Sequence, residues 1–328
     1  MKVDDLILTE LLNNGAFSKI YLSTKQGSSS IYTTVKINKI DNTKKEFFKN
    51  IFNNYIYALK DTNHPNIVKL IDIKETFNAN YLVLEYCNGG NLEDFSKKYF
   101  EEKKKPLTEK IVQYIMRQLV DTLKYLHQKK IIFRNVNPKK LLINYENEED
   151  KKNKNIMKAK IKLADFSLST HLKKGESTSV WAGSVNFMPP EILVEKNVEI
   201  KSDERIDIWS LGITFYKLLT GDFPFTSSDL TELKEKFNKG DYFVPITLSK
   251  EAISFLNCML KYDPNKRYSC EQLSKHSFLK KDVNEFHKIN LNELKNSKII
   301  DDSKINMSIQ NNDPILEICG DGIEDNIK

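Results

Sequence analysis

The sequence has no long hydrophobic run, and it has few cysteines. No apolar stretch reaches the roughly 18 residues that are needed to cross a bilayer. The first residues, Met-Lys-Val-Asp-Asp, carry two acids where a secretory signal has its basic region. The four cysteines are far apart and lack the CxxC or zinc-binding spacing, so we expect reduced thiols. These absences favour a cytoplasmic protein without a membrane span.

Arginine is also scarce, and lysine carries most of the positive charge. Only four of the 51 basic residues are arginines, and the formal net charge at pH 7 is +6. The lysines alternate with glutamate and asparagine, as in residues 97–105 and 148–160. A nucleic-acid track would separate basic from acidic residues and interleave aromatics. We therefore expect solvated loops in these segments and no nucleic-acid partner.

A change of pattern near residue 87 divides the chain. Before it, β-branched and alternating segments predict strands at 6–8, 20–22, 31–37, 67–73 and 81–86, with an amphipathic helix at 46–60. After Cys87-Asn-Gly-Gly90, helical periodicity predicts helices at 92–100, 108–128, 207–219, 230–238 and 250–260. From residue 280 onward the chain is polar with few hydrophobic anchors, which is typical of a tail or a partner-binding segment.

Two short segments between the helices carry the chemistry. In residues 131–143 an apolar pair leads into a polar turn and an apolar triplet leads out, which predicts a strand, a loop and a strand. A second apolar strand ends at an acid in Ile161-Lys-Leu-Ala-Asp-Phe-Ser167. The pair resembles the catalytic loop, His-Arg-Asp-Leu-Lys-x-x-x-Asn, and the metal-binding Asp-Phe-Gly segment of eukaryotic protein kinases.

This resemblance covers residues 6–279. The motifs in this part of the sequence are similar to those of the ULK kinases, the group that initiates autophagy. It rests on Tyr81-Leu-Val-Leu-Glu-Tyr-Cys-Asn-Gly-Gly90, Met116-Arg-Gln-Leu119 and Met188-Pro-Pro-Glu191. It implies an α+β, bilobal protein-kinase fold, with a small antiparallel β lobe that carries one helix and a larger, mainly α lobe. The implied boundaries are 1–87 and 88–279 for the lobes and 280–328 for a polar C-terminal tail, for which disorder is one expectation.

The resemblance also implies a set of ATP contacts. Lys36 matches the lysine that contacts the α- and β-phosphates, and Asp165 matches the metal-binding acid. Gly15 matches the middle glycine of the phosphate loop, in which Asn13 and Ser18 replace the neighbouring glycines. The implied cofactors are ATP and Mg²⁺, the latter through Asp165 only. The residues assigned to ATP are Leu12, Gly15, Ile20, Lys36, Glu85, Cys87, Asn91, Lys140, Leu142 and Asp165.

Four positions depart from the kinase pattern, although Arg134 of the loop is retained. Asn135 stands at the position of the catalytic aspartate, and an amide has no useful basicity near pH 7. Asn137 replaces the lysine that neutralises the transferred phosphoryl group. Lys140 replaces an asparagine that helps to hold a second magnesium, where an ammonium repels a cation. Tyr55 occupies the position of the glutamate that pairs with the strand lysine.

No nearby acid can replace that glutamate. Residues 47–60 contain none, and Glu46 lies nine residues before Tyr55, which is about 13 Å along a helix axis. Lys36 therefore needs another partner, for which Asp165 is our hypothesis. Groups of this kind typically contribute factors of ~10² to 10⁴ each, non-additively, so we expect very low residual activity.

Residues that support the fold are retained. The resemblance implies that Glu191 pairs with Arg267 and that Asp207 anchors the catalytic loop. The matches to the hydrophobic column between kinase lobes are Leu59, Phe133 and Phe166. All of them would be needed for the fold even without catalysis.

Lys140 has two interpretations. Its ammonium could reach the nucleotide phosphates and supply the charge that magnesium normally brings, so that binding would depend little on metal. Alternatively, it is a solvated lysine beside Lys139.

The sequence leaves three functions open. The leading hypothesis is an ATP-binding pseudokinase, a scaffold or allosteric protein partner in signalling, in an autophagy-like assembly or in a cytoskeletal one. The alternative is a weakly active Ser/Thr kinase that transfers the γ-phosphate to protein, with Asp165 or water handling the proton. The third is a structural partner that binds no nucleotide, because Thr34 replaces the small alanine over the adenine.

Overall fold

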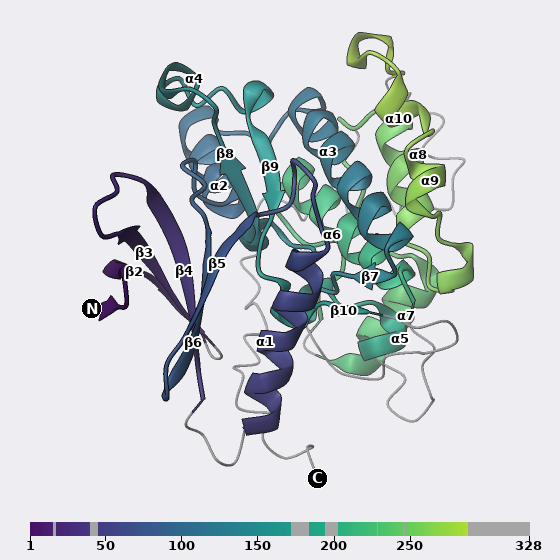
Figure 1. Cartoon of the computed structure of the whole chain (residues 1–328). Helices are drawn as coiled ribbons and strands as arrows, with labels where there is room; N and C mark the ends of the chain where they lie inside the picture. Colours follow the sequence, from purple (N-terminus) through teal and green to yellow (C-terminus); the bar gives the residue numbers. More distant parts are fainter. Residues whose placement is uncertain are drawn as a thin grey trace. The chain divides into compact units, whose positions relative to one another are not determined.

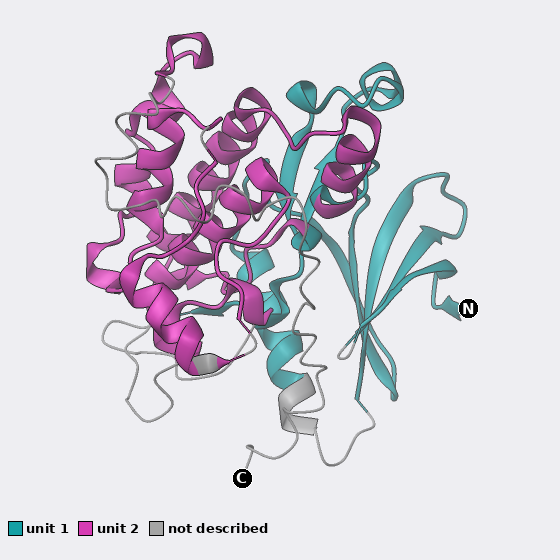
Figure 2. Cartoon of the chain, turned by 180° about the vertical axis from the view of Figure 1, so that it is seen from behind, with its two compact units in different colours: residues 1–92, 139–171 teal, residues 93–138, 172–328 magenta. Residues whose placement is uncertain are grey.

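The chain divides into two compact units, which we describe one at a time (Figures 1 and 2). The first unit contains residues 1–92 and 139–171, and the second contains residues 93–138 and 172–328. In this computed structural model, the described residues are 1–15, 18–39, 45–171, 184–193, 203–227, 229–245 and 247–287, without the side chains of 45–48 and 230. Most of the predicted tail, residues 288–328, lies outside the described residues.

The first unit is built on one antiparallel sheet with the strand order β1-β2-β3-β4-β6-β5. The strands are β1 Lys2–Val3, β2 Leu6–Asn14, β3 Lys19–Lys25, β4 Ile31–Asn38, β5 Leu70–Glu75 and β6 Ala79–Glu85. The pairing of β2 with β3 shifts register twice, between Leu8 and Glu10 and between Leu11 and Asn13. Such irregularities increase the local twist of a sheet.

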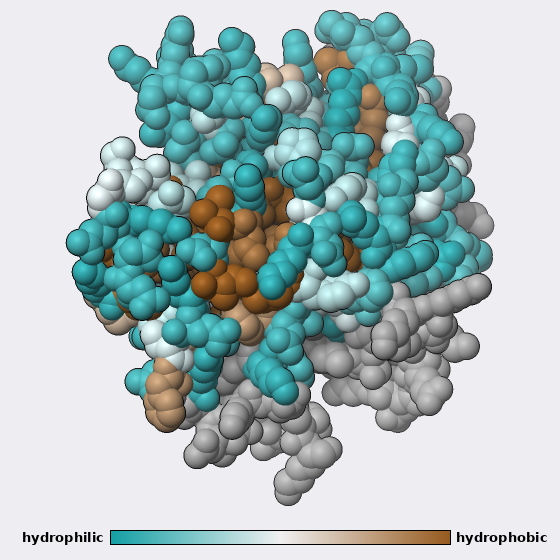
Figure 3. All heavy atoms as spheres, viewed as in Figure 1, coloured by the Kyte–Doolittle hydropathy of each residue, from teal (hydrophilic) through white to brown (hydrophobic). Residues whose placement is uncertain are grey.

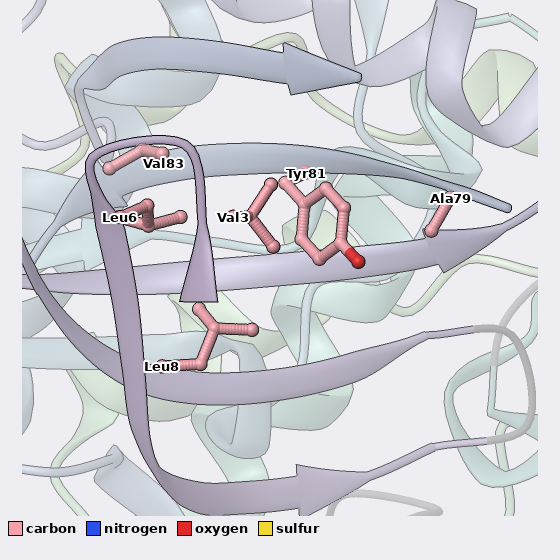
Figure 4. Close-up of a cluster of buried hydrophobic side chains, with 6 residues drawn as sticks. All are labelled: Val3, Leu6, Leu8, Ala79, Tyr81 and Val83. Carbon is pink, nitrogen blue, oxygen red and sulfur yellow. The ribbon is translucent and has the colours of Figure 1, made fainter. Parts of the chain in front are cut away.

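One face of this sheet encloses a small apolar cluster of its own (Figure 4). The buried members are Val3, Leu6, Leu8, Ala79, Tyr81 and Val83, and the partly buried Tyr21 and Tyr32 pack against them. All of these side chains come from strands. The sheet therefore covers this face with side chains of its own strands, and the cluster contains no described residue of α1.

A helix and a hairpin complete the first unit. The helix α1, Lys45–Lys60, packs against β4 and against η3, Phe166–Leu168. Strand β8, Leu141–Asn144, pairs with β9, Lys160–Leu163. The remaining short elements are η1 Pro138–Lys140, α4 Glu148–Lys152, η2 Ile156–Lys158 and β10 Thr170–His171. Residues 139–171 thus group with the sheet, and the lobe boundaries 1–87, 88–279 and 280–328 remain predictions.

The second unit is mainly helical. Its longer helices are α2 Leu92–Lys103, α3 Glu109–Gln128, α6 Arg205–Thr220, α7 Leu230–Lys239 and α8 Lys250–Met259. The short elements are β7 Ile131–Ile132, η4 Val185–Phe187, α5 Pro190–Leu193, η5 Pro264–Lys266, α9 Cys270–Leu273, α10 Ser277–Lys280 and η6 Val283–Glu285. These bounds confirm the predicted helices to within a few residues. None of the described helices is long and apolar enough to cross a membrane.

Helix α6 is the centre of the second unit, as its apolar sequence predicted. Nearly all of its side chains are buried. Gly212 is required where α6 meets α8, because a Cβ there would lie 2.9 Å from the Cβ of Met259. A contact that short forces one of the helices to move, so only glycine allows this close packing.

The described chain continues past residue 280 and is tied to α8. The buried carboxylate of Glu251 accepts a hydrogen bond from the backbone N–H of His287 at 2.9 Å. It also pairs with Lys281 Nζ at 3.2 Å. Residues 281–287 are therefore held against the second unit.

Candidate active site

In the second unit, Asp207 fixes the loop that follows β7. Its carboxylate accepts hydrogen bonds from the backbone N–H groups of Phe133 at 2.9 Å and Arg134 at 2.7 Å. Its Oδ2 also lies 2.8 Å from Nε2 of His127. Arg134 has a φ of 68°, a left-handed conformation that costs energy in a residue with a Cβ. The predicted role of Asp207 as the anchor of this loop is confirmed.

Two amides occupy the positions where the catalytic loop of a kinase carries an aspartate and a lysine. The Nδ2 of Asn137 donates to Oδ1 of Asn135 at 2.7 Å, and both side chains are buried. The side-chain carbonyl of Asn135 is thus already engaged by a neighbour in its own loop. A neutral amide of this kind neither accepts a proton nor neutralises a phosphoryl group.

A buried ion pair ties α5 to the segment after η5. Arg267 donates from Nη1 to Oε1 of Glu191 at 2.7 Å and from Nη2 to Oε2 at 2.6 Å. The guanidinium carbon also lies 5.0 Å from the ring centroid of Trp209. The predicted bidentate pair is confirmed, and it gives the fold support that does not depend on catalysis.

In the first unit, Asp165 is the centre of the candidate site. Its Oδ1 accepts a hydrogen bond from the hydroxyl of Tyr55 at 2.6 Å, and its Oδ2 forms an ion pair with the ammonium of Lys140. Tyr55 lies in α1, and Lys140 directly precedes β8. We call these three residues the Tyr55–Asp165–Lys140 cluster. Tyr55, which stands at the position of the missing glutamate, therefore reaches the acid to which the resemblance assigned the metal.

Charge and burial hold the protons of this cluster in place. Burial raises the pKa of Asp165, but Lys140 and the hydrogen bonds of Ser167 and Tyr55 outweigh it and bring the pKa below the ordinary 3.8. Burial, with the charge of Asp165, raises the pKa of Tyr55 well above 10.0. At neutral pH, Tyr55 is therefore a neutral donor and Asp165 is a carboxylate.

Replacing Tyr55 by phenylalanine is expected to lower the free energy of unfolding by about 1.5–3 kcal/mol at pH 7, because a hydrogen bond to a charged group is lost. Tyr55 is 1% exposed. Urea unfolding measures the change. Tyr57→Phe is the matched control, because Tyr57 lies in the same helix but is 45% exposed and should change stability by less than about 0.5 kcal/mol. Equal losses in both variants would contradict this account of Tyr55.

Lys36 does not reach Asp165, so our hypothesis for its partner is wrong. Direct cross-strand partners share a face of the sheet, and β4 pairs Lys36 with Tyr81. The ammonium of Lys36 lies 5.9 Å from the centroid of the Tyr81 ring, which belongs to the apolar cluster of Figure 4. The opposite face carries Val35, which pairs with Leu82. The register of β4 therefore directs Lys36 toward Tyr81 and this cluster, and not toward Asp165.

The same register separates Ile20, which was assigned to ATP, from Thr34, which was the argument against adenine binding. Ile20 pairs with Val35, so it lies on the face opposite Lys36. Thr34 lies on the Lys36 face, and its hydroxyl is 2.7 Å from that of Ser23. Thr34 therefore does not share a face with Ile20, and it does not supply the steric argument against adenine binding that the sequence suggested.

The end of β6 is fixed by side-chain contacts of Glu85, and the segment after β6 is fixed by β8. Oε1 of Glu85 accepts from Lys162 Nζ at 2.7 Å and from the backbone N–H of Lys69 at 2.7 Å. Burial, with the charge of Glu85, raises the pKa of Cys87 to about 12, so this thiol stays protonated. The sequence prediction missed Lys162, although a lysine between Ile161 and Leu163 in an apolar strand is a signal of a buried ion pair.

Backbone hydrogen bonds join this segment to β8. Gly89 donates to the carbonyl of Ile143, and Ile143 donates to that of Gly90, both at 2.8 Å. A Cβ on Gly89 would lie 2.7 Å from a side-chain atom of Ile143, so the approach requires glycine. Asn91 forms an isolated bridge with Leu142. Hydrophobic residues gather over β5 and β8 on the face shown in Figure 3.

The remaining predicted ATP residues lie at the open end of β2. Leu12 is 46% exposed, and the backbone N–H of Gly15 donates to the carbonyl of Ser18 at 3.0 Å. Residues 16 and 17 lie outside the described part of the chain. The roles of these residues, like those of Asn91 and Leu142, remain predictions.

The residues around Asp165 do not fit a magnesium ion. Mg²⁺ prefers several oxygen ligands in octahedral geometry, but both oxygens of Asp165 already have donors. The described residues contain no group of three or more His, Cys, Asp or Glu side chains that could hold a metal. The ammonium of Lys140 occupies the charged position that a cation would take, so the prediction of Mg²⁺ through Asp165 alone has no support.

Comparison with known proteins defines the class. The family model of the protein kinase domain matches residues 7–279, and the chain belongs to the protein kinase family. The sheet with one long helix and the mainly helical second unit agree with the predicted α+β kinase fold.

The chain is similar to Ser/Thr kinases of the ULK group. It is 30% identical over 281 residues to serine/threonine-protein kinase ULK3 of Xenopus laevis and 28% identical over 281 residues to ULK3 of Homo sapiens. It is 30% identical over 292 residues to serine/threonine-protein kinase atg1 of Dictyostelium discoideum. These matches cover 85–88% of the chain but 41–56% of the relatives.

Proposed function

We propose that the chain is an ATP-binding interaction module in which the kinase fold persists and phosphoryl transfer is lost. The observation that carries this proposal is the Asn135–Asn137 pair, two neutral amides hydrogen-bonded to each other at 2.7 Å. Transfer requires an acceptor for the hydroxyl proton and positive charge on the moving phosphoryl group. The loop supplies neither through these residues.

The support for a partner-binding role comes from what is retained. The Glu191–Arg267 pair and the hydrogen bonds of Asp207 are complete. The names of the relatives associate this sequence pattern with ULK and atg1 kinases. We therefore propose a scaffold or allosteric partner in signalling or in an autophagy-like assembly.

A phosphoryl-transfer assay tests the loss of catalysis. Purified protein with labelled ATP and Ser/Thr peptides is expected to yield no phosphopeptide above an Asp165→Ala control. Isothermal titration of the same protein with ATP is expected to show binding. Turnover that depends on Asp165 would overturn the proposal, and absence of ATP binding would remove its nucleotide part.

A weakly active Ser/Thr kinase is the second candidate. It is favoured by the retained carboxylate of Asp165 and by relatives that are named as serine/threonine-protein kinases. In this candidate the transfer assay would give slow, Asp165-dependent phosphopeptide formation. The same experiment therefore separates the two functions.

A further inference from the structure

Two described lysines stand at kinase positions near the phosphates, Lys36 at the strand lysine and Lys140 at the asparagine of the second magnesium, and they have different neighbours. Lys36 faces Tyr81 and the sheet cluster, whose members all come from strands. Helix α1 packs against β4 and η3, and its Tyr55 holds Asp165. Lys140 pairs with that same Asp165. Of these two lysines, Lys140 is therefore the one beside Asp165.

The Tyr55–Asp165–Lys140 cluster carries no net charge. Tyr55 is a neutral donor, and the carboxylate and the ammonium cancel. A kinase site that offers carboxylates to a polyphosphate repels it and needs a metal between them. Here Lys140 already neutralises Asp165, so no divalent ion is required for a phosphate to approach.

Lys140 can still bind a ligand. Its ammonium has three N–H donors, of which Oδ2 of Asp165 engages one direction. Its side chain remains 29% exposed. A phosphate oxygen can therefore take a charge-assisted hydrogen bond from it without breaking the ion pair.

Strand β8 connects this ammonium to the segment at residues 89–91, beside the residues Asn91 and Leu142 that the resemblance assigned to ATP. Lys140 precedes β8, and Ile143 of β8 exchanges backbone hydrogen bonds with Gly89 and Gly90. Leu142, between them, is half-buried and bridges to Asn91. Three residues of strand span about 10 Å, so β8 separates the ammonium of Lys140 from the segment at residues 89–90 as a nucleotide separates its phosphates from its base.

We propose that this site binds a nucleoside triphosphate as the metal-free anion, with Lys140 as its phosphate contact and without Lys36. The inference rests on the proposed nucleotide binding and specifies the form of the ligand. The sequence left two interpretations of Lys140 open, and we thereby choose the one in which its ammonium makes nucleotide binding independent of magnesium. Lys36 is excluded as a contact of the phosphates.

Titration of the full chain with ATP tests the proposal in two buffers, one with EDTA and one with excess magnesium. Binding is expected to persist in EDTA and to change less than threefold when magnesium is added. Binding that appears only with magnesium would overturn this inference and leave the proposed function intact. Binding in neither buffer would instead refute nucleotide binding itself.

Variants separate the two lysines in EDTA. Lys140→Met is expected to weaken ATP binding at least tenfold, as the loss of one charge-assisted contact implies. Lys36→Met should change it less than twofold, as should the control Lys39→Met, whose ammonium pairs with Glu75 at 3.0 Å outside the cluster. A tenfold loss in Lys36→Met, or none in Lys140→Met, would overturn the assignment.

A second substitution at position 140 controls for misfolding. Lys140→Asn returns the kinase residue to this position and is expected to convert ATP binding to a magnesium-dependent form, with weak binding in EDTA. Retained urea midpoints would show that both Lys140 variants fold. Metal-independent binding by folded Lys140→Asn would contradict the role of the ammonium.

Discussion

Replacing Arg267 by methionine is expected to lower the free energy of unfolding by about 3–5 kcal/mol, because it leaves the buried carboxylate of Glu191 without its partner. The guanidinium is fully buried and makes two hydrogen bonds to Glu191. It also donates from Nε to the carbonyl of Lys261 at 2.8 Å and from Nη1 to that of Arg205 at 3.1 Å. Urea unfolding measures the loss.

A surface pair supplies the control for this variant. Lys236 and Glu232 form an (i, i+4) pair at 2.7 Å in α7, and Glu232 is 55% exposed. Glu232→Ala should cost less than about 1 kcal/mol. Arg267→Lys keeps the charge but not the two-pronged geometry, so an intermediate loss is expected. A loss below about 1 kcal/mol in Arg267→Met would contradict the structural role of the pair.

Replacing Asp207 by alanine is expected to cost at least about 3 kcal/mol, since it removes an acceptor for two buried backbone N–H groups and for His127. The three contacts lie between 2.7 and 2.9 Å. The loop with Asn135 and Asn137 should also lose its fixed conformation. Asp222→Ala, at an exposed position of the same unit, should change stability by less than about 0.5 kcal/mol.

The loss in Asp207→Ala is expected to depend on pH through His127. Burial lowers the pKa of His127, but Cys270, whose Sγ lies 3.6 Å from Nδ1, and Asp207 raise it to about 10. A raised pKa contributes stability that is complete below the unfolded value of about 6.5. That contribution disappears as the pH rises through about 10. The wild type should therefore lose stability between these values, and Asp207→Ala should lose less over the same range.

These two positions bear on function because they separate fold from chemistry. Arg267 and Asp207 hold the second unit together through charges that are buried and fully paired. The Asn135–Asn137 pair, by contrast, stabilises the loop with neutral groups. A module that binds partners needs the first kind of interaction, whereas a transferase needs charge in the loop as well.

Much of the fold followed from periodicity. The apolar spacing of residues 46–60 predicted α1, and the nearly continuous apolar run at 207–219 predicted the buried α6. The lost acid at 135 was visible in the sequence, since an amide cannot act as a base in any conformation. So was the ammonium at 140, and the buried pair of Glu191 with Arg267 followed from the resemblance.

The contact partners of the charged side chains, by contrast, did not follow from the sequence pattern. The alternation of Thr34, Val35 and Lys36 defines two faces of a strand but does not say which face carries the apolar cluster, because a slip of one residue exchanges them. The pairing of Lys36 with Tyr81 decided it. Likewise, nothing in the spacing of Tyr55, Lys140 and Asp165 along the chain showed that the acid would bind both of the others.

The sequence by itself determined which elements form and which catalytic groups are missing. Helix and strand patterns are local, and the chemical type of each side chain is known from the sequence. Only the tertiary structure decided which lysine faces Asp165 and that magnesium does not fit beside it. Those outcomes depend on strand register and on contacts between residues up to 110 positions apart, as between Tyr55 and Asp165, and no local pattern encodes them.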